Sequence, residues 1–153
     1  CPESRGLGDV YKRQKRESWI VFTENKKQAK EFNKIINIKG FKSALYNTDL
    51  DSAERSENLN KFKKADLNVL VTCTALDEGF DMPEADGALI LSASSSKRQR
   101  VQRMGRVLRI TENKPNALIV TVYSSKTEFD KLMEEAKRYH KEGVPVSWKR
   151  QDR

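Results

Sequence analysis

Five short apolar runs, separated by segments of helical periodicity, constrain this 153-residue chain more than any other feature of its sequence. The runs span residues 19–22, 44–46, 69–71, 88–91 and 117–122, and they are rich in Val, Ile and aromatic residues. Each run is short enough to be a buried strand. Parallel strands need a crossover, which is usually a helix, so the alternation predicts a mostly parallel sheet covered on both faces.

The segments between the runs carry apolar residues at helical spacing. These residues are Ala29, Phe32, Ile35 and Ile36 in the first segment, Leu59 and Phe62 in the second, and Phe129, Leu132, Met133 and Ala136 in the last. Asp51 with Glu54 predicts a capping box at the start of the second helix. Pro115 lies among the turn-forming residues 111–116, so the preceding helix must end before the last strand begins. The expected fold class is α/β.

The two ends of the chain lie outside this pattern. Residues 1–14 show no period, and we expect a non-native or disordered leader there. The chain starts without Met, so we expect a fragment of a longer protein. One domain is expected over residues 15–142, because 153 residues suffice for one compact α/β domain and not for two. We expect residues 143–153 to be a tail or the start of a following segment.

Composition narrows the function classes. The chain has 30 Lys and Arg against 22 Asp and Glu, and this net charge of +8 favours contact with polyanions such as nucleic acid. Cys1 and Cys73 lack the spacing of a zinc site or a disulfide framework, so we expect a reducing compartment. No apolar run approaches the roughly 18 residues of a membrane helix. We therefore expect no membrane partner and a cytoplasmic or nucleoid-associated location, with a phage origin left open.

The densest cluster of charge lies at residues 95–109. Its six cations, with no acid among them, are Lys97, Arg98, Arg100, Arg103, Arg106 and Arg109. On a helix of about 100° per residue, one amide and three guanidiniums share a face, those of Gln102, Arg103, Arg106 and Arg109. A solvated helix face is the alternative, but such a face mixes charges of both signs and has little use for Gly105. The pattern favours a face that binds phosphate, because guanidinium makes paired hydrogen bonds to phosphate oxygens.

Residues 72–83 follow the third apolar run, and the carboxyl edge of a parallel strand is where open α/β sheets bind ligands. Gly79 lies close to Asp81 and Pro83, so we expect a tight bend that presents a carboxylate. A plain connection from strand to helix is the alternative. We expect Cys73 to be a small buried residue rather than a nucleophile, and the single His140 to be a surface residue.

Four segments together resemble the motifs of superfamily 2 helicases. Residues 102–109, Gln-Arg-Met-Gly-Arg-Val-Leu-Arg, look like motif VI, Q-R-x-G-R-x-x-R. Residues 74–83 resemble motif V, and residues 20–25, Ile-Val-Phe-Thr-Glu-Asn, resemble motif IV. Residues 46–62, with Arg55, Leu59 and Phe62, match the small motif after the second strand. The order and spacing of these segments agree with the family from residue 17 to residue 123, which is most of the chain.

The resemblance implies the C-terminal RecA-like lobe, or helicase C domain, of an ATP-driven DNA helicase or translocase. This lobe is a three-layer parallel sheet of the P-loop NTPase type, flanked by helices. The implied catalytic residues are Arg106 and Arg109, arginine fingers that reach the γ-phosphate. The implied nucleotide-binding residues are Gln102, Arg103, Gly79 and Asp81, and the implied nucleic-acid-binding residues are Thr74, Arg55 and Thr23. ATP and Mg²⁺ would be held mainly by an N-terminal RecA-like lobe, and no residue of this chain is expected to bind metal.

The chain departs from a complete motor in one respect. It contains no Gly-Lys pair and hence no Walker A loop, so we expect the chain alone to be inactive as an ATPase.

Two alternative functions stay open for a chain with these motifs. One is the translocating subunit of a restriction enzyme or a phage remodelling helicase, and the other is a stand-alone nucleic-acid-binding adaptor with a degenerate motor lobe. A generic phosphate-binding α/β enzyme would need a glycine-rich loop after the first strand, and residues 23–27 contain no glycine.

Overall fold

The computed structural model describes residues 17–47, 49–73, 85–91, 98 and 118–148. The strands are β1 (Trp19–Phe22), β2 (Ser43–Leu45), β3 (Val69–Thr72), β4 (Gly87–Ile90) and β5 (Leu118–Thr121). The described helices are α2 (Lys26–Ile38), α3 (Ser52–Lys63) and α5 (Lys126–Lys141). The chain divides into two compact units between Val122 and Tyr123. The five strands with α2 and α3 belong to the first unit, and α5 belongs to the second.

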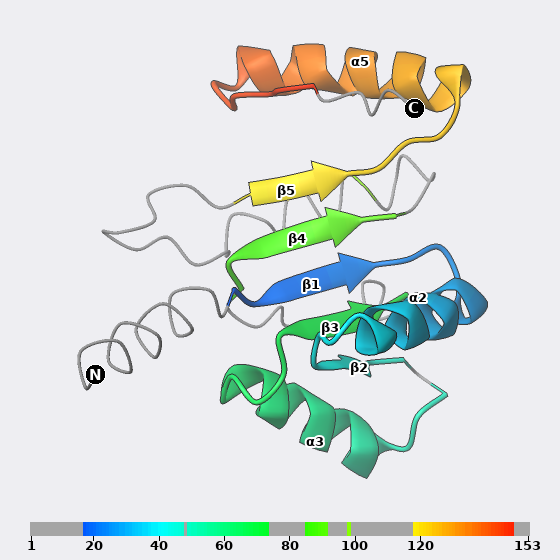
Figure 1. The fold of residues 1–153 in the computed structure, drawn as a ribbon. Helices are drawn as coiled ribbons and strands as arrows, with labels where there is room; N and C mark the ends of the chain where they lie inside the picture. The colour runs from blue at the N-terminus through cyan, green and yellow to red at the C-terminus, as the bar shows by residue number, and fades with distance from the viewer. Residues whose placement is uncertain (1–16, 48, 74–84, 92–97, 99–117, 149–153) are drawn as a thin grey trace, which may run out of the picture. The chain divides into compact units, whose positions relative to one another are not determined.

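The strands of the first unit form one parallel sheet in the order β2-β3-β1-β4-β5 (Figure 1). The central strand β1 pairs with β3, where Trp19 lies opposite Val69, and with β4, where Trp19 lies opposite Gly87. Each predicted strand is found within one residue of its expected bounds. The predicted α/β class with a parallel sheet is therefore confirmed.

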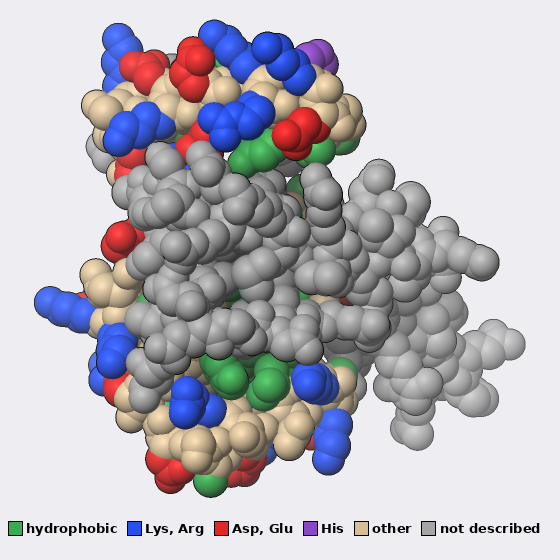
Figure 2. Space-filling view, turned by 180° about the vertical axis from the view of Figure 1, so that it is seen from behind, with side chains coloured by type: hydrophobic (Ala, Val, Ile, Leu, Met, Phe, Trp, Pro, Cys, Tyr) green, Lys and Arg blue, Asp and Glu red, His purple; other side chains and the backbone are tan. Residues whose placement is uncertain are grey.

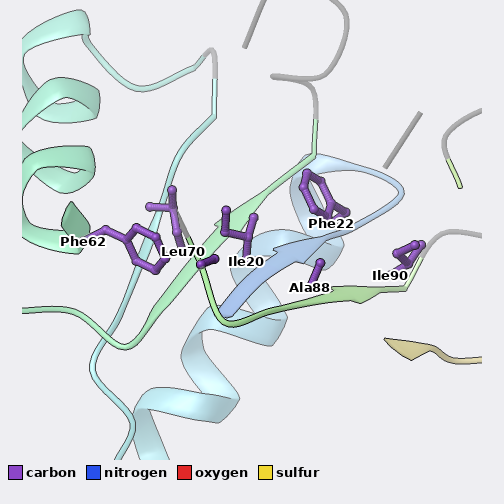
Figure 3. Close-up of a cluster of buried hydrophobic side chains, with 7 residues drawn as sticks. Ile20, Phe22, Phe62, Leu70, Ala88 and Ile90 are labelled. Carbon is purple, nitrogen blue, oxygen red and sulfur yellow. The ribbon is translucent and has the colours of Figure 1, made fainter. Parts of the chain in front are cut away.

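Each face of the sheet has its own apolar core and its own described helix. One core joins α3 to the sheet and consists of Ile20, Phe22, Phe62, Leu70, Ala85, Ala88 and Ile90 (Figure 3). The other joins α2 to the opposite face and consists of Val21, Ala29, Val69, Val71 and Cys73. Successive residues of β1 enter different cores because side chains of a strand alternate between its two faces. The result is the predicted three-layer arrangement.

The described helices of the first unit begin at polar caps. Asn25 caps α2, and its side chain accepts a hydrogen bond from the Gln28 N–H at 2.8 Å. Asp51 caps α3 as predicted, but its carboxylate accepts from the Ala53 N–H at 2.9 Å, so the cap does not use Glu54 as the capping box requires. Caps of this kind satisfy N–H groups that have no partner in the first turn of a helix.

One apolar residue of α2 lies outside the core that its spacing predicts. Ile35 is 51% exposed. Phe32 and Ile36, one helical turn apart, pack against the core on this face. The buried stripe of α2 therefore passes on one side of Ile35, although Ile35 shares the helical spacing of the apolar residues around it.

The second unit consists of α5 and the chain on either side of it. The helix starts with a capping box, in which the Glu128 N–H donates to the Ser125 hydroxyl and the Ser125 N–H donates to the Glu128 carboxylate, each at 3.2 Å. The Phe129 ring lies 5.2 Å from that of Trp148, centroid to centroid. Charges of both signs mix on the exposed surface of α5 (Figure 2), as on a solvated helix face. None of the described helices is long and apolar enough to cross a bilayer.

Gly87, at the start of β4, is covered by an aromatic ring from the neighbouring strand. A Cβ atom added at Gly87 would lie 2.6 Å from the Cη2 atom of Trp19 and within 2.8 Å of two further ring carbons. These separations are far below van der Waals contact. The indole of Trp19 therefore occupies the space that any side chain at residue 87 would need.

We expect Gly87→Ala to lower the free energy of unfolding by about 1–3 kcal/mol, the usual cost of overpacking a well-packed site. Urea denaturation of the 153-residue chain measures it. Adding Trp19→Val should make the double variant lose less than the sum of the two single losses, because a smaller side chain leaves room for the new methyl group. Strictly additive losses would contradict the steric explanation.

Candidate functional site

The carboxyl ends of β1 and β3 lie side by side, and the chain leaves them in opposite directions. From β1 it runs through α2 to β2, beyond β3, whereas from β3 it continues to β4, on the other side of β1. Where connections reverse in this way, an open parallel sheet has a crevice at its carboxyl edge that binds ligands. The segment that resembles motif IV includes the end of β1, and the segment that resembles motif V begins just after β3. This edge is the candidate site.

Thr23 follows β1 directly and is 1% exposed. Its N–H donates to the Thr72 carbonyl oxygen at 2.9 Å, and its hydroxyl oxygen lies 3.2 Å from the same atom. The hydroxyl is also 3.3 Å from the carbonyl oxygen of Asn25. These bonds join the ends of β1 and β3 inside the fold. A contact between Thr23 and nucleic acid stays a prediction.

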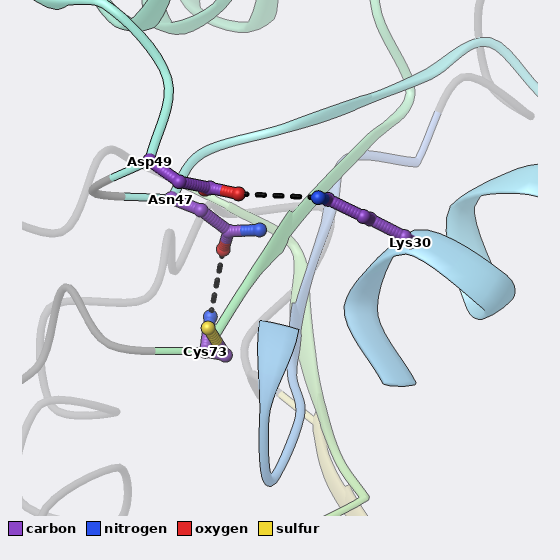
Figure 4. Close-up of polar contacts among 4 residues, drawn as sticks. All are labelled: Lys30, Asn47, Asp49 and Cys73. Carbon is purple, nitrogen blue, oxygen red and sulfur yellow. Dashed lines mark hydrogen bonds and ion pairs between the residues drawn. The ribbon is translucent and has the colours of Figure 1, made fainter. Parts of the chain in front are cut away.

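Asn47, which follows β2, is a site residue that the sequence reading missed. It is 1% exposed, and its Oδ1 accepts a hydrogen bond from the Cys73 N–H at 3.2 Å (Figure 4). Its Nδ2 is buried without a hydrogen-bond partner in the described part of the chain, and so is the hydroxyl of Thr72 at the end of β3. Leaving a buried polar group unpaired costs about 1–3 kcal/mol. Such groups in a folded protein call for a specific explanation, such as a ligand or an ordered water.

An ion pair reaches the same edge from α2. Lys30 Nζ lies 3.3 Å from Asp49 Oδ2, two residues beyond Asn47 (Figure 4). Burial tends to raise the pKa of Asp49, but the hydrogen bond from Lys30 and the charges of Lys30 and Lys26 outweigh it and hold the pKa below its ordinary value of 3.8. Asp49 and Lys30 therefore form a charged pair at this edge.

Two lysines at the start of α2 were also missed. Lys26 and Lys27 lie in the first turn, which contains no acidic residue, and both are exposed. The amino-terminal end of a helix carries partial positive charge, so cations there are unfavourable unless an anion lies nearby. The available signal was a pair of lysines immediately after the helix cap, directly following the segment that resembles motif IV.

Arg55 lies in the first turn of α3, which follows β2 at the same carboxyl edge. The side chain is partly buried, and its Nε has no hydrogen-bond partner among the described residues. The helices α3 and α2 cover opposite faces of the sheet. Arg55 and Lys26 therefore lie at the same carboxyl edge but on opposite faces of the sheet. The guanidinium retains a donor for an acceptor outside the described residues.

The other predicted site residues lie outside the described part of the chain, and their roles stay predictions. They are Thr74, Gly79 and Asp81 in the segment that resembles motif V, and Gln102, Arg103, Arg106 and Arg109 in the segment that resembles motif VI. Of the basic run, Arg98 is described, and only 2% of it is exposed. Cys73 is buried and His140 is exposed, as predicted.

The second unit has a groove beside α5, and its lining has fewer groups that could bind or activate a substrate than the carboxyl edge of the sheet. It is lined by Met133, Ala136, Lys137, His140, Lys141, Val146 and Trp148. These lining residues include no carboxylate and no hydroxyl or thiol nucleophile, so they do not provide a constellation for acid–base or covalent catalysis. The carboxyl edge of the sheet is the stronger candidate.

Two solved helicase domains have the same fold as this chain. The C-terminal domain of the DEAD-box protein Dbp5 matches 90% of this chain and 78% of its own with a TM-score of 0.70 and 19% identity. The helicase domain of Pyrococcus furiosus Hef matches 85% of this chain and 27% of its own, with a TM-score of 0.59 and 23% identity. These similarities show the fold.

The chain belongs to the helicase conserved C-terminal domain family, whose family model matches residues 4–111. The DNA 3'-5' translocase XPB2 of Sulfurisphaera tokodaii is 35% identical over 79% of this chain and 26% of its own length. The UvrABC system protein B of Fusobacterium nucleatum is 32% identical over 71% of this chain and 17% of its own. The chain thus spans about a quarter or less of these relatives. The resemblance to superfamily 2 helicases is confirmed, and the domain limits at residues 15 and 142 stay predictions.

We expect Asp49→Asn to destabilise the folded chain at neutral pH and to have little effect well below pH 3.8. Because folding lowers the pKa of Asp49, its ion pair stabilises the fold above the ordinary pKa, and this contribution is lost as the pH falls through the folded-state pKa. Urea midpoints of the wild type and the variant, compared across this range, measure the effect. Lys30→Met should show the same convergence at low pH, and a difference that stays constant with pH would contradict the ion pair.

Proposed function

We propose that this chain is the C-terminal motor lobe of an ATP-dependent DNA helicase or translocase. It would supply arginine fingers to ATP held by an N-terminal RecA-like lobe and would contact the nucleic-acid backbone. The observation that carries the proposal is that β1 and β3, whose ends adjoin two motif-like segments of the sequence, are neighbours where connections of the sheet reverse. A parallel sheet binds its ligands at such a point.

The described residues lack the features of a main ATP-binding site. They suit a lobe that would line the other side of a cleft whose ATP is held elsewhere. A P-loop needs a glycine-rich turn after the strand and free N–H groups at the helix start. Here the chain passes from β1 to α2 through Thr23, Glu24 and Asn25, and the Asn25 side chain already binds the Gln28 N–H. A triphosphate with its Mg²⁺ would therefore be held by the N-terminal lobe, and its cleavage supplies the energy of the motor.

The chain's own part in phosphoryl transfer would be electrostatic. Arg106 and Arg109 would stabilise the negative charge that develops on the transferring phosphoryl group, as arginine fingers do. The same cleft would be lined by Gln102, Arg103, Gly79 and Asp81. The fingers act only when the two lobes close on each other, so closing and opening would follow the nucleotide cycle.

On the nucleic-acid side, the contacts would go to phosphates rather than bases. Lys26 and Lys27 are exposed cations at the positive end of α2, and the Nε of Arg55 has no hydrogen-bond partner in the described part of the chain. Thr74 and Thr23 are the further predicted contacts. Phosphate contacts of this kind bind without regard to sequence, as a translocating motor requires. The 35% identity to a protein named a DNA translocase supports DNA as the track.

In a two-lobe protein that carries this chain behind an N-terminal RecA-like lobe, Arg106→Ala or Arg109→Ala should lower ATP turnover roughly 10³-fold or more. Binding of a single-stranded oligonucleotide, measured by fluorescence anisotropy, should change little, because the proposed fingers would contact the nucleotide and not the strand. Arg138→Ala on the exposed surface of α5 is the matched control and should leave both quantities unchanged. Wild-type turnover in either finger variant would remove the assignment.

The 153-residue chain alone should hydrolyse no ATP above a blank, because an arginine finger needs a nucleotide held by another lobe. It should also bind single strands weakly. Measuring both quantities separates the motor lobe from the adaptor. Tight binding by the chain alone, falling steeply with salt, would favour the adaptor, and a robust ATPase rate would contradict the motor-lobe assignment. A nuclease motif downstream in the full gene product would favour the restriction subunit.

A further inference from the structure

The end of β3 is held from both sides by side chains of its neighbours. On the β1 side, the hydroxyl of Thr23 lies 3.2 Å from the Thr72 carbonyl oxygen. On the β2 side, the Oδ1 of Asn47 accepts from the Cys73 N–H at 3.2 Å (Figure 4). Residue 74, where the segment that resembles motif V begins, comes next. The two side chains therefore fix the backbone at the point where the chain leaves the sheet for that segment.

The strand register explains why these two residues meet the same strand end. Val71 of β3 lies opposite Leu45 of β2 and opposite Val21 of β1. Two residues further on in each strand come Asn47, Cys73 and Thr23, on the face of the sheet that α2 covers. The apolar core on this face thus ends in a short polar row at the carboxyl edge.

Asn47 lowers the stability of the folded chain at this position. Its side chain is almost fully buried, yet its Nδ2 finds no hydrogen-bond partner among the described residues. Burying an unpaired donor lowers stability, so the fold by itself gains little from an amide over an apolar side chain. The side chain of Asn47 makes one described hydrogen bond, which it accepts from the Cys73 N–H. This bond is the structural role that the described residues give to Asn47.

We propose that Asn47 is a positioning residue that fixes the Cys73 backbone and thereby the start of the segment that resembles motif V. It acts through the Cys73 backbone, from whose N–H its Oδ1 accepts a hydrogen bond. The inference rests on the proposed function, because that segment contains Thr74, Gly79 and Asp81, which the proposed function assigns to the two ligands. Loosening Asn47 should therefore slow turnover more than it weakens nucleotide binding.

Chemical labelling of the Cys73 thiol tests whether Asn47 fixes the Cys73 backbone, and it needs no ATPase measurement. The chain has two cysteines, so a Cys1→Ser background leaves Cys73 as the single site for iodoacetamide. We expect Asn47→Ala to speed labelling of Cys73 about tenfold under native conditions, because local opening exposes a buried thiol. Asn58→Ala is the matched control, since the Asn58 Nδ2 also donates to a backbone carbonyl, that of Leu45 at 2.9 Å, but does not hold β3. Equal labelling rates in the two variants would overturn the proposal.

Turnover in the two-lobe protein tests the functional half of the inference. Asn47→Ala should lower nucleic-acid-stimulated kcat by about tenfold while KM for ATP stays within about twofold, and Asn58→Ala should match the wild type. Asn47→Asp keeps an acceptor for the Cys73 N–H and should restore most of the lost kcat. The proposal fails if Asn47→Ala behaves like Asn58→Ala, or if Asn47→Asp is as slow as Asn47→Ala. A wild-type protein without stimulated hydrolysis would instead overturn the proposed function, and the labelling rates would still decide whether Asn47 holds Cys73.

Discussion

The parallel pairing of β1 with β3 and with β4 is the constraint on which the rest of the structure depends. It places Val21 and Val71 in the core under α2, and Ile20 and Leu70 in the core under α3. Because both faces are buried, a slip of one residue would exchange the two cores, so the register is strongly specified. The same register ends β1 and β3 side by side, which creates the edge where the candidate site lies.

The carboxyl edge of the sheet contains several groups that lower the stability of the fold. Lys27 stands at the positive end of a helix, where a cation reduces the stability of that helix. The Nδ2 of Asn47 and the hydroxyl of Thr72 are buried without hydrogen-bond partners in the described residues. Elsewhere the described helices follow the favourable rules, as the capping box of α5 shows. Local rules are broken where a protein binds a ligand, so these violations support the same site as the sheet topology.

Local patterns explain most of what could be predicted from the sequence. The strands follow from short apolar runs, and the cap at Asp51 follows from its residue type, because both depend on neighbours in the chain. The choice between Ile35 and Ile36 could not be predicted, since helical spacing fits both and packing against the sheet decides. Asn47 was beyond reach because its partner Cys73 is 26 residues away and meets it only through the register of β2 and β3. The burial of Arg98, within a basic run, likewise depends on tertiary packing.

The position of β3 gives the proposed motor a way to couple its two ligands. Under the proposed function, one segment beginning at residue 74 carries both a nucleic-acid contact and nucleotide contacts, and it starts from a strand end fixed by Thr23 and Asn47. Under the proposed function, the contacts with both ligands would then start from one backbone position that these hydrogen bonds fix. A lobe that only bound nucleic acid would gain nothing from this arrangement. The buried amide of Asn47 therefore has a physical reason in a motor that it lacks in an adaptor.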